Sequence, residues 1–293
     1  MNTSDFVIKR ENILSTFFVG WLAFLLTLRI NFKHIIIPVI GQLFGILLIS
    51  LAPILEFREM LPVFETPDGW VYVSLSVIGV IFFVYFLWRF FVALSGVNLL
   101  ARDVYDNRAI ANLSFYISEI QRKKWSYIRF LIGYAIIASI FTAITAGILF
   151  LERNFVSYDF WTNLLSFTII MIQTVVILTY ILFSNIAIQG YTYNRIIGFW
   201  NTFKKIFSFI KDNFANFSLL SILTIIFSNI IAYLAQAFLS FFIINPLDLY
   251  SDNSITIAIR FTVGFIINAF VVVLLQFIYS RFYLNEEENA LRI

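Results

Sequence analysis

The sequence has 293 residues, of which 61% are hydrophobic and 13% are charged, and its formal net charge is +3. This composition excludes an ordinary soluble domain, because such domains contain about twice that share of charged residues. Long runs of Ile, Leu and Phe, with five prolines and no cysteine, indicate α-helical spans and exclude disulfides and thiolate metal sites.

The first apolar segment, residues 13–32, follows a basic pair formed by Lys9 and Arg10. We expect it to be retained, because its apolar run ends at Leu28 and is followed by Arg29 and Lys33, where a signal peptide would have a small-residue cleavage site. Its apolar residues recur at helical spacing, which predicts an amphipathic helix in the membrane interface. A re-entrant segment and a seventh span are the alternatives.

Six later runs are long and apolar enough to cross a bilayer as helices. They cover residues 35–56, 70–98, 128–151, 161–189, 215–244 and 256–282. Pro-containing or acidic loops join them in pairs, which predicts three hairpins that turn on one side of the membrane. The sequence therefore predicts an all-α integral membrane protein with six transmembrane helices in a single polytopic domain, residues 1–293.

Two further segments between the hairpins, residues 113–126 and 195–213, also have helical apolar spacing. In the second, the apolar face includes Trp200, Phe203 and Phe207. Its opposite face carries the lysines Lys204, Lys205 and Lys211. A helix with aromatic residues on one side and lysines on the other is typical of the membrane interface.

These segments divide the chain into three units of surface helix plus hairpin, about 13–98, 112–189 and 195–284. Some residues recur between the first and third units: Gly20, Trp21, Asn31 and Phe32 in one, and Gly198, Trp200, Asn213 and Phe214 in the other. Coincidence in a Phe- and Ile-rich chain is the alternative, so the threefold repeat is a hypothesis.

The distribution of positive charge predicts the orientation. Sixteen of the 20 Lys and Arg residues lie in the N-terminal segment, the two connections between hairpins and the C-terminal tail. The loops within the hairpins hold only Arg58 and Arg153. Because cytoplasmic loops retain Lys and Arg, we expect a cell (inner) membrane protein with both termini cytoplasmic.

Two stretches carry a wider pattern: VNLLARDVYDNRAIANLSFYISEIQRKKWSYIRFL at 97–131 and ILFSNIAIQGYTYNRIIGFWNTFKKIFSFIKDNF at 181–214. They resemble, respectively, the central connection and the entry to the fifth span in the membrane-domain superfamily named after glycerophosphoryl diester phosphodiesterases. The resemblance covers most of the chain and implies a fold and a membrane location. It implies no catalytic residues, because those phosphodiesterases do their chemistry in a separate TIM barrel that this sequence does not contain.

Polar residues inside the spans are the candidates for an intramembrane site, because burial of polar groups in lipid is costly. We single out Arg89, Gln173, Asn229 and Gln236, and expect a cleft lined by the second, fourth and fifth spans. Other amides within the spans include Gln42, Asn185, Asn268 and Gln276. Snorkelling of Arg89 to the headgroups and hydrogen bonding between helices are the structural alternatives.

Small residues at four-residue spacing predict close helix packing. They are Gly41 and Gly45 in the first span, and Ser139, Ala143 and Gly147 in the third. The single histidine, His34, has no neighbouring ligand types and is expected at the interface.

No catalytic carboxylate pair, activated nucleophile, phosphate-binding loop or metal motif stands in the sequence, so we expect no enzyme, cofactor or metal. The expected role is membrane organisation or assembly, through surfaces that bind anionic lipid or a protein partner, with a homo-oligomer left open. These surfaces comprise Arg122, Lys123, Lys124, Trp200, Lys204, Lys205 and Lys211. The alternative is a permease-like protein or a transporter membrane subunit that moves a lipid or small solute. Nucleic acid is not an expected partner.

Overall fold

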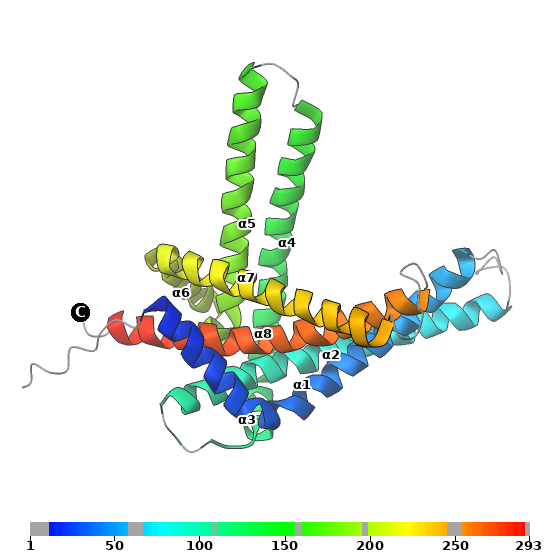
Figure 1. Cartoon of the computed structure of the whole chain (residues 1–293), viewed down its shortest axis with the longest axis horizontal. Helices are drawn as coiled ribbons and strands as arrows, with labels where there is room; N and C mark the ends of the chain where they lie inside the picture. The colour runs from blue at the N-terminus through cyan, green and yellow to red at the C-terminus, as the bar shows by residue number, and fades with distance from the viewer. Residues whose placement is uncertain are drawn as a thin grey trace, which may run out of the picture.

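The computed structural model describes residues 12–57, 67–106, 108, 110–155, 160–194, 199–244 and 254–290. The elements in this part of the chain are helices: α1 (Ile13–Phe57), α2 (Pro67–Tyr105), α3 (Leu113–Arg122), α4 (Lys124–Phe155), α5 (Phe160–Asn194), α6 (Phe199–Asp212), α7 (Phe214–Leu239), the π-helical turn η1 (Ser240–Ile244) and α8 (Ser254–Ala290). Six of them, α1, α2, α4, α5, α7 and α8, are long and apolar enough to cross a membrane. This confirms the all-α polytopic fold (Figure 1).

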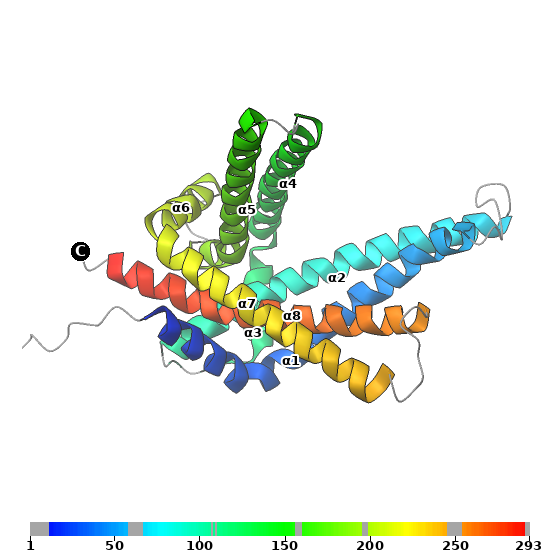
Figure 2. The same ribbon diagram turned by 45° about the horizontal axis from the view of Figure 1, so that its top comes forward.

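Helix α1 is continuous where the sequence predicted an interfacial helix followed by a separate span. Its 45 residues would extend about 68 Å, more than twice the hydrocarbon thickness of a bilayer. The helix changes direction along its length, as Figure 2 shows for its dark-blue beginning and its lighter continuation. Pro38 lies within α1 and favours a bend, because it lacks a backbone N–H and its ring crowds the carbonyl of the residue four positions earlier. Because the helix is continuous from Ile13 to Phe57, the expectation of two separate helices is wrong.

The other two surface segments are short helices, as expected, with shifted ends. Helix α3 begins after Asn112, whose side chain accepts a hydrogen bond from the Ser114 N–H at 3.3 Å, and it ends at a turn centred on Lys123. The sequence had placed this helix across the turn, to residue 126. Helix α6 covers Phe199–Asp212, and the predicted start at residues 195–198 lies outside the described residues.

Among the described helices, α1 and α2 share the most extensive contact. A Cβ atom on Gly45 would lie only 2.8 Å from the carbonyl oxygen of Gly79, and one on Gly41 would overlap the ring of Phe86. Larger residues at these two positions would push the helices apart. The close packing predicted from Gly41 and Gly45 is confirmed.

The hydrophobic core lies where the C-terminal halves of α2, α5 and α8 meet. Leu100 of α2, Ile186 of α5 and Phe277 of α8 have no exposed surface. Each of these helices is the second member of a hairpin, paired with α1, α4 and α7 respectively. The three hairpins are therefore joined through their second helices.

The first helix of each unit packs on the last helix of another unit: α3 on α2, α6 on α5, and the N-terminal part of α1 on α8. A glycine faces an isoleucine at each contact. The pairs are Gly96 with Ile117, Gly190 with Ile206, and Gly20 with Ile278. The contacts close a ring around the junction, so the packing follows the three units expected from the sequence.

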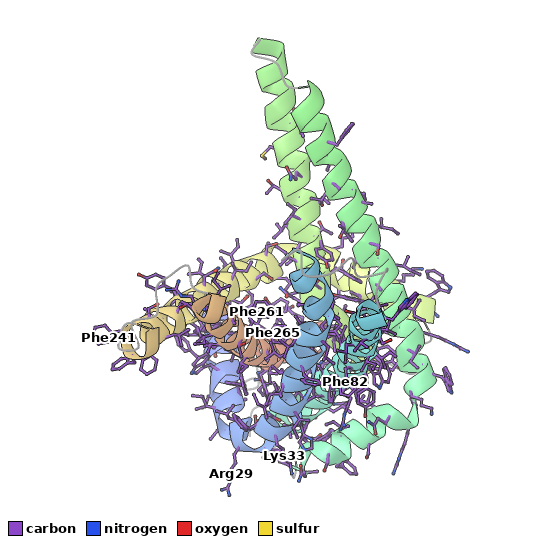
Figure 3. All side chains as sticks on the ribbon, turned by 90° about the vertical axis from the view of Figure 1, so that its right-hand side faces the viewer. Arg29, Lys33, Phe82, Phe241, Phe261 and Phe265 are labelled. Atoms are coloured by element: carbon purple, nitrogen blue, oxygen red, sulfur yellow. The ribbon has the colours of Figure 1, made fainter. Side chains whose placement is uncertain are left out.

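Away from the junction the hairpins diverge. Hairpin α4–α5 rises at a steep angle to α1–α2 and α7–α8 (Figures 1 and 3). Only 6% of the most apolar stretch of α4 is buried, compared with 39% in α8. Helix α4 packs mainly on α5 and meets α3 and α6 as further partners. The α4–α5 hairpin is thus held at its base.

Candidate functional site

A cavity of about 410 Å³ lies just beyond the junction, between α1, α2, α4, α5 and α8. Most of its wall is apolar, including Leu87 and Phe90 of α2 and Val272 of α8. Its polar lining consists of Gln42, Tyr134, Ser184, Asn185, Asn268 and Gln276. None of these side chains is charged. A mainly apolar cavity with a few convergent polar groups is the usual form of a small-molecule site.

One end of the cavity is deep and polar. Gln276 is 5% exposed, and its Oε1 accepts a hydrogen bond from Gln189 Nε2 at 2.9 Å. Asn185 Nδ2 donates to Tyr279 Oη at 2.9 Å, and Tyr279 Oη lies 2.7 Å from Thr224 Oγ1. These bonds connect α5, α7 and α8 and close the cavity at the junction.

Beyond the cavity, toward the C-terminal ends of α2, α5 and α8, further hydrogen bonds join α2 to α5 and α8. Ser280 Oγ donates to Asn98 Oδ1 at 3.0 Å, and Tyr193 Oη donates to the Asn98 carbonyl at 2.8 Å. Tyr105 Oη donates to the Phe277 carbonyl at 2.8 Å. Interhelical bonds of this kind hold helices in register inside a membrane.

Some buried polar atoms at this level have no hydrogen-bond partner among the described residues. They are Gln189 Oε1 and Asn98 Nδ2. Ser184 Oγ near the Tyr134 hydroxyl, and Ser221 Oγ of α7 near the Tyr279 hydroxyl, also form no well-aligned hydrogen bond. An unsatisfied buried polar group is costly, so each such atom indicates a place for water or a ligand. Ser184 stands in the cavity wall itself.

The structure does not bring together the four polar residues singled out from the sequence. Arg89 is exposed on α2, with its guanidinium carbon 5.9 Å from the centre of the Tyr85 ring. Gln173 is half-buried in α5, and Asn229 is exposed on α7 and donates to its own helix, at Ile225. Gln236 reaches the Arg260 carbonyl at 3.4 Å. None of the four is among the residues described as lining the cavity.

The amides that do line the cavity were visible in the sequence as polar residues inside spans. Gln42, Asn185, Asn268 and Gln276 come from three sequence-distant helices, α1, α5 and α8. Sequence reasoning preferred Asn229 and Gln236 because they share a face of one helix. Only the packing of different helices places the other four around one space.

Helix α6 uses most of its apolar face inside the protein. The ring centre of Phe203 lies 5.5 Å from that of Phe130, and that of Phe209 lies 4.6 Å from that of Tyr283. Ile206 has no exposed surface. The aromatic stripe is therefore explained by packing at the base of α4–α5, while Trp200 remains 78% exposed.

The predicted basic residues lie at the surface around these contacts. Arg122, Lys123 and Lys124 are exposed at the turn between α3 and α4. Lys124 Nζ lies 5.9 Å from the Trp125 ring centre. Lys204 and Lys211 are exposed on α6, and Lys205 is half-buried. Two separate groups of cations thus flank the base of the α4–α5 hairpin.

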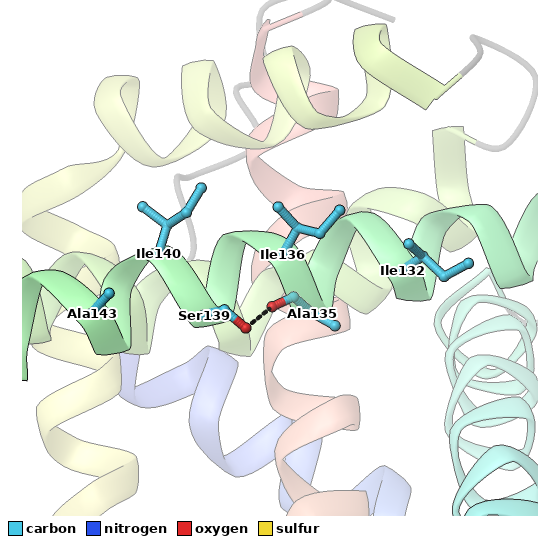
Figure 4. A pocket seen from close by; sticks show the side chains of 6 residues that line it. All are labelled: Ile132, Ala135, Ile136, Ser139, Ile140 and Ala143. Atoms are coloured by element: carbon cyan, nitrogen blue, oxygen red, sulfur yellow. Dashed lines mark hydrogen bonds between the residues drawn. The ribbon is translucent and has the colours of Figure 1, made fainter.

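The small residues of α4 face outward (Figure 4). Ala135, Ser139 and Ala143 run beside Ile132, Ile136 and Ile140 along a shallow apolar groove, and Ser139 Oγ donates to the carbonyl of Ala135 at 2.9 Å. No described atom lies within 4 Å of a Cβ built on Gly147. The close packing predicted for this stripe does not occur within the described chain.

In the part of the chain that the structure describes, no group of three His, Asp or Glu side chains could hold a metal ion. No family model matches the sequence, and neither a curated protein nor a solved structure matches it. The site is therefore argued from its geometry alone.

Proposed function

We propose that this multi-pass membrane protein is permease-like and holds a lipid or small solute in the cavity between α1, α2, α4, α5 and α8. The observation that supports this best is the lining: amides from three helices converge on a space of about 410 Å³ that is otherwise apolar. Amide side chains are costly inside a bilayer unless they have partners. Gln42, Asn185 and Gln276 each have one such partner within the protein, and a bound molecule would supply partners for their second amide atoms and for Asn268.

Matched asparagine variants test this function. Asn268→Leu removes an amide from the cavity lining, whereas Asn229→Leu makes the same change on the exposed face of α7. Native mass spectrometry of the gently extracted protein should show a bound lipid or solute that Asn268→Leu loses and Asn229→Leu retains. Equal retention by both variants would refute a function of the cavity.

A second candidate function is membrane organisation through the two cation groups. Arg122, Lys123 and Lys124 in one group, and Lys204 and Lys211 in the other, are exposed. Each contributes about 1 kcal/mol to attraction by an anionic surface. Neutralising Lys204 and Lys211 should then weaken association with anionic nanodisc lipid and leave cavity binding unchanged. If only the cavity variants have an effect, the permease-like function alone survives.

The proposed function also implies an orientation of the protein in the membrane and a class of protein. We propose a cell-membrane protein with both termini cytoplasmic and no catalytic chemistry, related to the membrane-domain superfamily that it resembles. The excess of Lys and Arg on one set of connections supports the orientation. Topology reporters inserted in residues 57–69 and 99–126 should report opposite sides of the membrane, and reports from the same side would reject it.

A further inference from the structure

If the cavity is a binding site, as proposed above, the chemistry of its lining limits the classes of ligand that it can bind. All the polar residues of its lining are amides or hydroxyl groups, and no Asp, Glu, Lys, Arg or His is among the described residues that line it. A charged ligand group at the deep end would be buried without an opposite charge. Burying an unpaired charge costs far more than burying a neutral polar group, so the cavity selects against ionised ligands.

The deep end of the cavity is suited to a ligand group that both donates and accepts hydrogen bonds. Ser184 Oγ is buried near the Tyr134 hydroxyl, which lines the same cavity, and forms no well-aligned hydrogen bond with it. The bonds of Asn185 to Tyr279 and of Gln276 to Gln189 use one amide atom of each lining residue. The second amide atoms, Asn185 Oδ1 and Gln276 Nε2, form no further hydrogen bond with described residues. An acceptor, a donor and a hydroxyl thus belong to the lining of one cavity. A ligand hydroxyl can both donate and accept, whereas an ester or ether oxygen only accepts.

The remainder of the cavity suits a hydrocarbon chain. On α8 the lining runs from Gln276 at the deep end to Phe265, a length of about 16 Å along the helix. Asn268, toward the Phe265 end, is exposed, whereas Gln276 is buried. The volume of about 410 Å³ has room for roughly a dozen groups of the size of water. A longer chain must therefore leave by the exposed end, toward the diverging hairpins.

We propose that the cavity binds an uncharged lipid through its hydroxyl headgroup, with the hydroxyl between Ser184, Asn185 and Gln276 and the chain directed toward Asn268. Charged phospholipids are excluded from this site, although they surround the protein. The ligand enters from the hydrophobic phase, because its chain points to the end of the cavity from which the hairpins separate.

Three probes of equal chain length test the headgroup: dodecan-1-ol, its methyl ether and dodecanoate. Their affinities for the full-length protein in nanodiscs can be compared by displacement of bound ligand in native mass spectrometry. We expect the alcohol to bind about tenfold more tightly than the ether, the upper range for one hydrogen bond, and dodecanoate to bind least. Ser184→Ala should reduce the advantage of the alcohol over the ether. Ser139→Ala removes a hydroxyl from the outer face of α4 and should leave it unchanged.

The outcomes separate this inference from the function on which it rests. If the ether binds as well as the alcohol, or dodecanoate binds best, and Asn268→Leu still abolishes binding, the cavity is a binding site and the hydroxyl headgroup is wrong. If Ser184→Ala and Ser139→Ala behave alike, the deep end does not recognise the hydroxyl. If no probe binding depends on Asn268, the proposed function and this inference both fail.

Discussion

Hairpins α1–α2 and α4–α5 have similar apolar sequences with small residues at four-residue spacing, yet they are packed very differently. In α1–α2, Gly45 lies against the backbone of Gly79, and the second half of α1 is in close contact with α2. In α4–α5, the stripe of Ala135, Ser139 and Ala143 faces outward, and a Cβ on Gly147 would meet no described atom. The same pattern thus accompanies a closed contact in one hairpin and an open surface in the other.

The difference shows that a small-residue stripe specifies how closely a helix can be approached, and not what approaches it. The α4–α5 hairpin depends instead on contacts at its base, where Phe130, Phe183, Tyr191 and Phe203 stack. Its stability should therefore respond to substitutions at the base and tolerate substitutions along its length. The stability of the α1–α2 hairpin should instead respond to substitutions along the contact between its two helices.

The largest effect is expected for Phe203→Ala in α6. Phe203 is 4% exposed and stacks on both helices of the hairpin, so its removal should lower the free energy of unfolding by about 3–5 kcal/mol. Denaturation in mixed SDS micelles measures this loss. The control is Trp200→Ala in the same helix, because Trp200 is 78% exposed. An equal or larger loss for Trp200→Ala would show that α6 is held mainly by its outer face.

The next largest change in stability is expected for one of two glycines, one in each hairpin. Gly45→Leu places a side chain against the Gly79 backbone, which cannot move aside as a side chain does. It should lower the free energy of unfolding by about 1–3 kcal/mol. Gly147→Leu enters open space and should change stability by about 0.5 kcal/mol or less. The same denaturation assay applies. A comparable loss for Gly147→Leu would mean that another helix covers α4, for example that of a second copy.

A smaller effect is expected for two glutamines of α5. Gln189→Leu leaves Gln276 Oε1 without its donor and should cost about 1 kcal/mol, as interhelical hydrogen bonds in membranes do. The double variant Gln189→Leu with Gln276→Leu should recover part of that loss, because both polar partners are then removed. Gln173→Leu, farther along α5 and half-buried, should be close to neutral. Equal losses at the two positions would contradict a base-anchored hairpin.

The smallest effect concerns the contact of α3 with α2. Burial and a 2.6 Å hydrogen bond to Asp103 raise the pKa of Tyr116 above its ordinary value of 10.0. The neutral side chain therefore stabilises the folded protein fully below pH 10, and this contribution is lost as the pH rises through the folded-state pKa. Thermal unfolding of wild type and Tyr116→Phe should show a steeper decline above pH 10 in the wild type. Parallel curves would contradict this.

The sequence was informative about elements and less so about the site. Long apolar runs predict the helices, since only helices satisfy the backbone within each span. The same pattern led to a division of α1 into two helices, because Arg29 and Lys33 interrupt the apolar run without interrupting the helix. For the site, Gln276 and Asn185 were recognisable as polar residues inside spans, but their convergence depends on how α5 and α8 cross. The stripe containing Phe203 suggested lipid contact because lipid and a protein core attract the same side chains.

The sequence by itself determined that this is an all-α membrane protein with six long apolar helices, because apolar length and backbone hydrogen bonding leave few alternatives. It also indicated three units of surface helix and hairpin. Only the tertiary structure decided that the units close in a ring through α2, α5 and α8, and that the hairpins diverge beyond it. It alone placed four distant amides around one cavity, because interhelical contacts depend on complementary shape, which the hydrophobic pattern does not record.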